Sequence, residues 1–458
     1  MRITPLNAWI AGKVGHQGEL LTRSAIQAWQ LNRLRETLAL VREKSAFYRE
    51  HLSAAPTELG RLDDLAQCGF TTPEDIAREG QRMLCVSQGE IERVVTLDSS
   101  GTTGAAKRLF FTREDQELTI DFFGVGMSTL VEPGDRVLIL LPCERPGSVG
   151  DLLAKGLERQ RAYPLKHGPV RDLAETLQLL AQEKVDALVG VPVQVLALAR
   201  QRNDQARRAL RLQSALLSTD YLPPAIAVAL EEAWGCRVFD HYGMTEMGLG
   251  GGVQCEARRG YHLREADLYV EVVDPATGRE VPEGEYGEVV FTTLTRRGMP
   301  LIRYRTGDLS RFIPERCACG TALRSLEPVR QRLSGRAALG ASLTLSQADL
   351  DDALFPFAEV LDVRAELSHQ GDRDHLSVLV RTVPGAGNAL RPRLKAALWS
   401  VPALAEAQSR GVLDLALQVD ASGYAPPLSA AKRAIKDTRG PTGMSKSEQC
   451  LSRAGSCR

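Results

Sequence analysis

The sequence predicts an α/β protein with a large N-terminal domain of mixed sheets and helices and a small α+β C-terminal domain. First, short apolar runs alternate with helical stretches from Val94 to about Asp308, which is typical of βα units and a largely parallel sheet. Second, the strand-like runs Leu268–Val273 and Gly287–Thr293, with an Asp-Pro-Ala-Thr-Gly turn between them, predict an antiparallel pair. Third, the chain beyond Ser334 combines strand and helix patterns in a separate segment.

The individual elements follow from hydrophobic periodicity. The first hundred residues are mostly helical in pattern, with one apolar face made by Ile26, Trp29, Leu34, Leu38 and Val41. The alternating region predicts strands at Ile91–Leu97, Arg136–Leu141, Ala187–Val191, Ser214–Ser218 and Arg237–Asp240, and helices at Val170–Glu183 and Gln194–Arg211. The last segment predicts strands at Val363–Leu367, His375–Arg381 and Leu413–Val419 and a helix at Ala389–Ser400.

Length divides the chain into several units. The 458 residues exceed one typical domain of about 100–200 residues. We expect residues 1–90 to form the mostly helical part of the large domain and residues 91–334 its core. Residues 335–440 would form the small domain, and residues 441–458, rich in Gly, Ser and Lys, a disordered tail.

Composition and charge restrict the partners and the location. Lys plus Arg and Asp plus Glu both number 57, so the balance is neutral and argues against nucleic acid or an anionic membrane as a main partner. No apolar run approaches the ~18–20 residues of a membrane span, and no signal-peptide order begins the chain. Nine cysteines, an odd count, do not favour a disulfide framework. We therefore expect a soluble cytoplasmic protein, and leave open whether it forms a homodimer.

A loop rich in hydroxyls and glycines follows the first predicted strand. Two glycines let successive backbone N–H groups point at one anion, the hydroxyls add donors, and a lysine adds a mobile positive charge. Such a loop suits the β- and γ-phosphates of a nucleotide, although it is not a Walker sequence. An ordinary surface turn is the alternative. Its candidate residues are Ser99, Ser100, Gly101, Thr102, Thr103, Gly104 and Lys107.

Two further motifs follow predicted strands, Asp240-His-Tyr-Gly-Met-Thr-Glu246 and Tyr304-Arg-Thr-Gly-Asp308. With the hydroxyl-rich loop, their order resembles the adenylate-forming superfamily of acyl-CoA synthetases. The closer resemblance is to the phenylacetate–CoA ligase branch, through Phe47-Tyr-Arg49, Gly260-Tyr-His-x-x-Glu-x-Asp267 and Cys317-Ala-Cys-Gly320. The resemblance covers about residues 25–340 and implies a large adenylate-forming domain with a small, mobile C-terminal domain.

The resemblance also implies an activity and a set of site residues. Such enzymes activate a carboxylic acid with ATP, release pyrophosphate, and pass the acyl group to a thiol, usually that of coenzyme A. Lys107 and its loop would hold the β/γ-phosphates, Thr245 would donate to the α-phosphate, and Glu246 would bind Mg²⁺. The nucleoside would be bound by Asp220, Asp240, His241, Tyr242, Gly243, Asp308 through the ribose hydroxyls, and Arg336.

The C-terminal part departs from the family pattern. Ala337 and Ala338 stand where the family has hinge aspartates after Gly-Arg. The family's catalytic lysine would fall at Ala430 if the segment is aligned on Lys-Arg, or at Lys432 if it is shifted by two. We favour Lys432 over Lys436, while a basic helix end remains the alternative.

Three cysteines and a histidine suggest a metal. Cys255 and His262 bracket a polar turn, and Cys317 and Cys319 lie in a turn that ends at Gly320. Structural Zn²⁺ commonly takes a Cys₃His set, and paired exposed thiols without a metal are oxidation liabilities. Reduced thiols beside a satisfied histidine are the alternative interpretation.

Three functions therefore stay open. An ATP-dependent acid–CoA ligase ranks first, with ATP or AMP, Mg²⁺ and coenzyme A as its ligands. An adenylating enzyme with a non-CoA acceptor ranks second, and a nucleotide-binding regulatory protein that has lost turnover third. The sequence does not identify the acid, although residues 142–156 are expected to contribute to its pocket.

Overall fold

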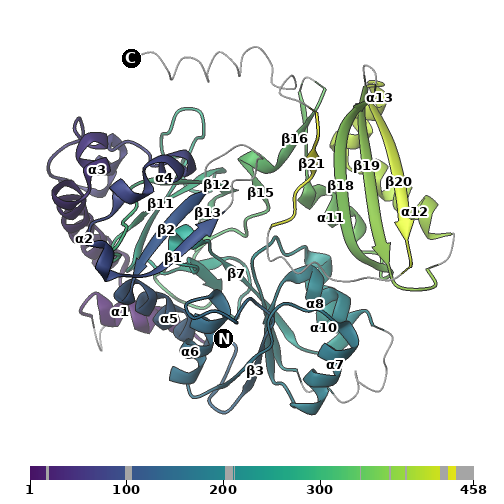
Figure 1. Cartoon of the computed structure of the whole chain (residues 1–458), viewed down its shortest axis with the longest axis horizontal. Helices are drawn as coiled ribbons and strands as arrows, with labels where there is room; N and C mark the ends of the chain where they lie inside the picture. Colours follow the sequence, from purple (N-terminus) through teal and green to yellow (C-terminus); the bar gives the residue numbers. More distant parts are fainter. Residues whose placement is uncertain are drawn as a thin grey trace.

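The computed structural model describes residues 1–16, 20–97, 106–201, 210, 212–340, 342–370, 373–386, 389–422 and 432–439. Among these residues, no helix is both long and apolar enough to span a membrane. The structure is an α/β protein with several sheets (Figure 1), as the sequence predicts.

The N-terminal part is helical. It contains α1 (Pro5–Lys13), α2 (Arg23–Lys44), α3 (Ala46–His51) and α4 (Pro73–Glu79). Helix α2 begins at a Thr22 cap whose hydroxyl accepts from the Ala25 N–H. Its predicted apolar face is confirmed, since Ile26, Leu34, Leu38 and Val41 are buried and Trp29 donates its indole N–H to the Ala266 carbonyl.

A nine-stranded sheet forms the centre of the large part. Strands β4, β3, β5, β6 and β7 are parallel, and β8, β9, β14 and β13 extend the sheet antiparallel beyond β7. The bounds are β3 Arg136–Ile139, β4 Tyr163–Lys166, β5 Ala187–Gly190, β6 Ser214–Leu217, β7 Arg237–Tyr242, β8 Gly252–Gln254, β9 Tyr261–Leu263, β13 Phe312–Ile313 and β14 Ser325–Leu326. Helices pack on this sheet at α5 Arg113–Met127, α6 Val149–Arg159, α7 Leu173–Gln182, α8 Pro192–Ala199 and α10 Pro224–Trp234.

One predicted helix has different ends. The predicted Gln194–Arg211 helix instead starts at Pro192 and ends at Ala199, and residues 202–209 and 211 lie outside the described residues. Proline at the first position fixes a helical φ and explains the earlier start. At the other end, the Arg200 guanidinium donates to the carbonyls of Phe355 and Val360 in the C-terminal part. Periodicity does not reveal a tertiary contact of this kind.

Two antiparallel sheets complete the large part. Strands β10 (Leu268–Val273), β11 (Gly287–Thr293), β12 (Tyr304–Ser310) and β15 (Gln331–Arg332) form one, and β1 (Ile91–Leu97) with β2 (Lys107–Thr112) forms the other. The β10–β11 pairing confirms the predicted antiparallel pair. The β11–β12 register shifts near Gly307, whose φ of 73° is a conformation that glycine adopts without strain.

The C-terminal part pairs its strands among themselves. A two-stranded sheet joins β16 (Arg336–Leu339) to β17 (Leu343–Ser346), and a four-stranded sheet has the order β20-β19-β18-β21. Figure 1 shows this sheet beside the large part, with β21 on its inner side. Its remaining bounds are α11 Gln347–Leu354, β18 Val360–Gln370, β19 Arg373–Thr382, α12 Leu390–Trp399, α13 Pro402–Ser409, β20 Leu413–Asp420 and β21 Lys436–Asp437. The predicted strands and helix are confirmed here, whereas the domain boundaries stay a prediction.

Helices α5 and α6 cross in close backbone contact, and this contact yields a stability prediction. A Cβ on Gly124 would lie 2.8 Å from the Gly156 carbonyl oxygen, whereas a Cβ on Gly126 would meet only the Val253 side chain at 3.5 Å. We expect Gly124→Ala to destabilise the chain by about 1–3 kcal/mol through overpacking. Gly126→Ala, on the same helix, is the matched control and should be neutral or slightly stabilising. Denaturant unfolding of the two variants checks this. Equal free energies of unfolding for the two variants would contradict the prediction.

Candidate functional site

A cavity of about 970 Å³ lies where the C-terminal ends of the parallel strands meet the antiparallel sheets and the C-terminal part. Its polar lining comes from Glu74, Arg78, Lys107, Ser218, Thr219, His241, Thr245, Glu246, Tyr304, Thr306, Arg332, Ser334 and Lys432. Its apolar lining comes chiefly from Leu97, Phe122, Phe123, Met127, Leu141, Val149, Leu153, Val189, Leu216, Leu249 and Val253. One cavity therefore joins a charged region to an apolar region.

The predicted phosphate loop connects β1 to β2. Its residues Ser99, Ser100, Gly101, Thr102, Thr103 and Gly104 lie outside the described residues. The two flanking residues are described: Leu97 pairs with Lys107 across the hairpin, and both line the cavity. The hairpin therefore fixes both ends of the loop at the cavity wall.

Lys107 and Glu246 form an ion pair inside the cavity. The Lys107 ammonium lies 2.6 Å from Glu246 Oε1, and the side chains are 21% and 6% exposed. Tyr304 donates its hydroxyl to the same oxygen at 3.1 Å, and Arg296 donates to the Glu246 backbone carbonyl. Glu246 lies with Thr245 in a short 3₁₀ turn, η4 (Thr245–Met247), soon after β7. A carboxylate held in this way facing a cavity is a cation-binding group.

Asp308 is the second anchored carboxylate. It is fully buried, and accepts from Arg332 Nε at 2.5 Å on one oxygen and from the Tyr242 hydroxyl at 3.0 Å on the other. Burial raises the pKa of Tyr242 well above 10, so its hydroxyl remains a donor. The Lys432 ammonium lies 3.6 Å from Asp308 Oδ1. Lys432 and Arg332, which both line the cavity, thus bring two positive charges from different parts of the chain to one carboxylate buried behind the lining.

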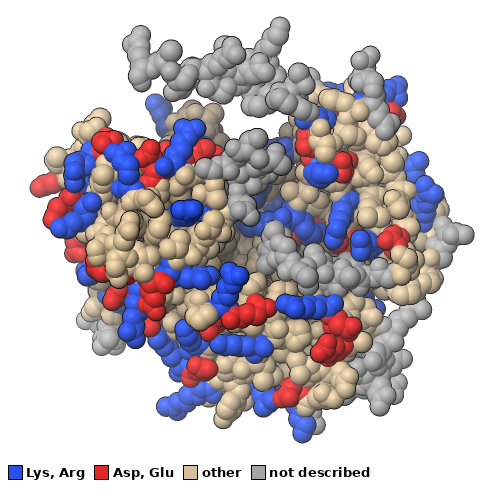
Figure 2. All heavy atoms as spheres, viewed as in Figure 1, with Lys and Arg blue, Asp and Glu red and all other residues tan. Residues whose placement is uncertain are grey.

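The segment that carries Lys432 is fastened to both parts of the chain. Its neighbour Arg433 forms ion pairs with Asp220 of the large part and Asp351 of α11, each at 2.7 Å. Figure 2 shows Lys and Arg side chains gathered on this face where the two parts meet. Lys436, by contrast, is 70% exposed and pairs with Glu366 on the surface. The structure therefore brings Lys432, and not Lys436, to the cavity.

Several predicted nucleoside residues lie behind the cavity wall. Asp240 is buried and accepts from the Tyr261 hydroxyl at 2.5 Å, while Tyr261 stacks on Tyr242 at 5.6 Å between ring centroids. Burial raises the pKa of Asp240 to about 7, although hydrogen bonds from Tyr261 and the His241 backbone oppose this.

Of the other residues predicted to bind the nucleoside, some line the cavity and others lie outside its lining. Gly243 and His241 line the cavity, and burial lowers the pKa of His241 to about 4, so its imidazole is neutral near pH 7. Asp220 holds Arg433. Arg336, the first residue of β16, is exposed and donates to the hydroxyl of Thr344 in β17; it is not among the residues that line the cavity.

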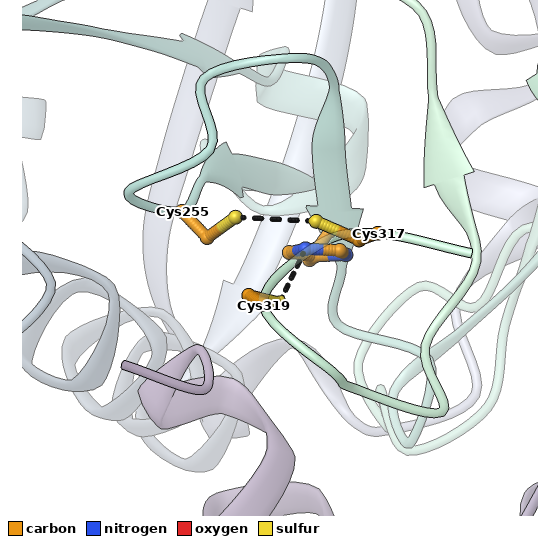
Figure 3. Close-up of side chains that lie close together, drawn as sticks. Cys255, Cys317 and Cys319 are labelled. Atoms are coloured by element: carbon orange, nitrogen blue, oxygen red, sulfur yellow. Dashed lines mark hydrogen bonds between the residues drawn. The ribbon is translucent and has the colours of Figure 1, made fainter. Parts of the chain in front are cut away.

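The four candidate metal ligands come together at a separate place. The ligand atoms of Cys255, His262, Cys317 and Cys319 all lie within 4.8 Å of one another. Figure 3 shows Cys255 on one loop pointing toward Cys317 and Cys319, which lie on another.

Sequence reasoning missed several cationic or positioning groups. Arg332 donates to the Asp308 carboxylate and Arg296 donates to the backbone carbonyl of Glu246, and no sequence motif indicates either contact. Arg433 stood out only as part of a basic run. Tyr304 belongs to the motif Tyr304-Arg-Thr-Gly-Asp308, but no role was predicted for it from the sequence. Its place in that motif was the one indication that it belongs to the site, where it donates to Glu246.

Comparison with known proteins shows the class of enzyme to which the chain is similar. Residues 93–294 match the family model described as AMP-binding enzyme, and this stretch contains the hairpin, Lys107 and the motif at β7. The chain is 32% identical over 328 residues to the phenylacetate-coenzyme A ligase of Thermus thermophilus, covering 69% of this chain and 72% of the relative. It is 29% identical over 332 residues to the phenylacetate-coenzyme A ligase of Pseudomonas putida, with the same two coverages.

Fold comparison agrees with the sequence. A crystal structure of 2-hydroxyisobutyryl-CoA ligase in the postadenylation state has a TM-score of 0.75 and 23% identity, covering 94% of this chain and 93% of that one. The 32% identity to the Thermus thermophilus relative, together with the matching family model, shows that the protein is an AMP-binding enzyme of the adenylate-forming superfamily. Within that superfamily, the chain belongs to the phenylacetate–CoA ligase family.

Proposed function

We propose that this protein is an ATP-dependent carboxylic acid–CoA ligase. One observation carries the proposal: a single cavity has Lys107, Glu246, Arg332 and Lys432 in its polar region and a compartment of apolar side chains beside them. The polar region fits the triphosphate and nucleoside of ATP, and the apolar compartment fits the body of an organic acid. Family membership agrees with this assignment.

The proposed reaction has two steps. A carboxylate oxygen of the acid attacks the α-phosphorus of ATP, the bond to the β-phosphate bridging oxygen breaks, and pyrophosphate leaves. The thiol sulfur of coenzyme A then attacks the acyl carbon and loses its proton, and AMP leaves. Each step ends with negative charge on a phosphate leaving group, pyrophosphate in the first step and AMP in the second, so fixed cations and positioning of the reactants supply most of the catalysis.

The described residues divide this work. Lys107 and the loop that it ends bind the pyrophosphate portion. Asp308, held rigid by Arg332 and Tyr242, accepts from the ribose hydroxyls. Lys432 places its ammonium beside Asp308, where it stabilises negative charge at the α-phosphate. Glu246 fits Mg²⁺, because its carboxylate already faces a cation within the cavity; the ion would neutralise phosphate charge there.

The apolar compartment indicates the kind of acid. Phe122 and Phe123 of α5, Leu153 of α6 and Leu141 after β3 line it. All four of these side chains are apolar. We propose a monocarboxylic acid with an apolar body, aryl or branched aliphatic.

Acid-dependent ATP–pyrophosphate exchange tests the proposal. A panel of aryl, branched and short polar acids should give exchange that is strongest for the apolar monocarboxylates. An exchange rate that does not depend on the acid would contradict the assignment. Binding of ATP without exchange for any acid would also contradict it and would favour a regulatory nucleotide-binding role.

The role of Lys107 gives a prediction of its own. Lys107→Ala should weaken Mg·ATP binding while AMP binding stays close to normal, because AMP lacks the phosphates that the ammonium contacts. The loss should be about 1.5–3 kcal/mol, the range for a charge-assisted hydrogen bond. Calorimetry with both nucleotides checks this. Arg113→Ala, at the first residue of α5 just after β2, is the control. An equal loss of affinity for ATP and AMP in Lys107→Ala would remove Lys107 from the pyrophosphate site.

A further inference from the structure

We propose that Cys255, His262, Cys317 and Cys319 bind one structural Zn²⁺, at a site separate from the cavity and not required by the ligase chemistry. The first argument is composition and distance. Three sulfurs and one imidazole nitrogen lie within 4.8 Å of one another, with Cys255 Sγ and Cys317 Sγ 3.5 Å apart and Cys319 Sγ 3.5 Å from His262 Nε2. A tetrahedral zinc site has sulfur–sulfur separations of ~3.8 Å and sulfur–nitrogen separations of ~3.5 Å.

The backbone arranges the ligands from two distant stretches. Cys255 directly follows β8, and His262 lies in β9, so the hairpin supplies two ligands. The other two stand in a turn closed by the hydrogen bond from the Gly320 N–H to the Cys317 carbonyl. Strand β14 pairs Ser325 with His262 and so places that turn against the hairpin (Figure 3).

The surrounding hydrogen bonds favour ligation. His262 Nδ1 lies 3.4 Å from the Arg324 carbonyl, which fixes the ring and leaves Nε2 directed at the sulfurs. The Ala257 N–H donates to Cys255 Sγ at 3.4 Å, a contact that stabilises a thiolate. Three of the four residues are buried and Cys317 is half-buried, so solvent reaches these groups poorly.

A disulfide explains the arrangement less well. Cys255 and Cys317 are free, and their 3.5 Å separation exceeds the ~2.05 Å of a sulfur–sulfur bond. A disulfide between them would also leave Cys319 and His262 without a common function. All four residues share one centre, which a metal alone accounts for.

The proposed zinc site lies next to contacts that hold α1 and β9, and β9 carries the tyrosine that donates to Asp240. Next to the ligand turn, Thr321 donates its hydroxyl to Asn7 of α1 at 2.7 Å, so the N-terminal helix is held there. On the other side, Tyr261 precedes His262 in β9 and donates to Asp240. Binding of zinc would therefore stabilise β9 and α1 together, and its free energy would add to that of folding.

Metal analysis of the full-length chain tests the proposal. Protein purified in reductant without chelator should contain about one zinc per chain. Exchange for cobalt should give the intense visible bands of a tetrahedral site and a thiolate-to-cobalt charge-transfer band, which requires no variant. His262→Cys should keep the metal as a Cys₄ site, and His262→Asn should lose it along with thermal stability.

The control is Cys236→Ser, which removes an equally buried thiol outside the cluster and should retain full zinc. The proposal is overturned if the chain takes up no stoichiometric zinc even when zinc is supplied, or if a Cys317→Ser/Cys319→Ser double variant binds as much as the wild type. A Cys255–Cys317 disulfide found by mass spectrometry in metal-free protein would also overturn it.

Discussion

Replacing Lys432 with alanine is expected to slow acyl-adenylate formation by about 10²–10³-fold, the loss seen when one preorganised charge stabiliser is removed from a transition state. Lys432 is the cation that the C-terminal part brings to the cavity, 3.6 Å from Asp308. Arg433, fixed by Asp220 and Asp351, holds its backbone in place. The measurement is single-turnover formation of acyl-AMP under saturating ATP.

Thioester formation from supplied acyl-adenylate should be much less affected. The family resemblance implies a small domain that turns between the two steps, and on that expectation a lysine that acts on adenylation is remote from the thiol. Lys436→Ala is the matched control, because that side chain is 70% exposed and pairs with Glu366 on the surface. If Lys436→Ala abolishes adenylation while Lys432→Ala leaves it intact, the assignment is wrong by four residues.

Asp308→Ala should weaken binding of ATP and AMP alike by about 1.5–3 kcal/mol, since both nucleotides carry the ribose whose hydroxyls this carboxylate accepts from. The variant should also lose stability, because Arg332 and the Tyr242 hydroxyl lose their shared partner. The stability loss should fall short of the ~3–5 kcal/mol of a fully buried broken pair, as Arg332 is 35% exposed.

Binding and unfolding must be measured separately for this variant. Asp308→Asn keeps an oxygen that can accept from Tyr242 and should preserve more stability than alanine, while AMP affinity still falls. Normal AMP affinity in folded Asp308→Ala would remove Asp308 from the nucleotide site.

Much of the fold could be predicted because its signals are local. The strand at Ile91–Leu97 was predicted with its observed bounds, and the apolar face of α2 follows from residues spaced by one helical turn. Strands β3, β5 and β6 are buried along nearly their whole length, and continuous apolar runs reveal such strands well. The antiparallel extension through β8, β9 and β14 was missed, because strands of two or three residues carry almost no period.

Site residues that belong to sequence motifs could be predicted, whereas site residues that are positioned by tertiary packing could not. Lys107, Thr245 and Glu246 were found from their motifs, and the structure places all three at the cavity. Tyr242 was expected to help bind the nucleoside, and this stays a prediction. The structure shows Tyr242 buried and stacked on Tyr261 of β9, a contact that the sequence spacing does not reveal.

Arg332 illustrates the same limit. The sequence drew attention to Arg336 in a Ser-Gly-Arg motif, whereas the side chain that reaches Asp308 is four residues earlier, on β15. Pairing of β15 with β12 sets Arg332 opposite Asp308, and only the sheet register shows this. The cytoplasmic location and a homodimer stay predictions.

Product analysis after one reaction tests the central claim most directly. The protein is incubated with Mg·ATP, coenzyme A and the acid that gives the strongest pyrophosphate exchange, and the products are quantified together. A carboxylic acid–CoA ligase must form AMP, pyrophosphate and acyl-CoA in equal amounts, and must form no thioester when the acid is omitted. Formation of ADP and phosphate, or of AMP without any thioester, would contradict the proposed function.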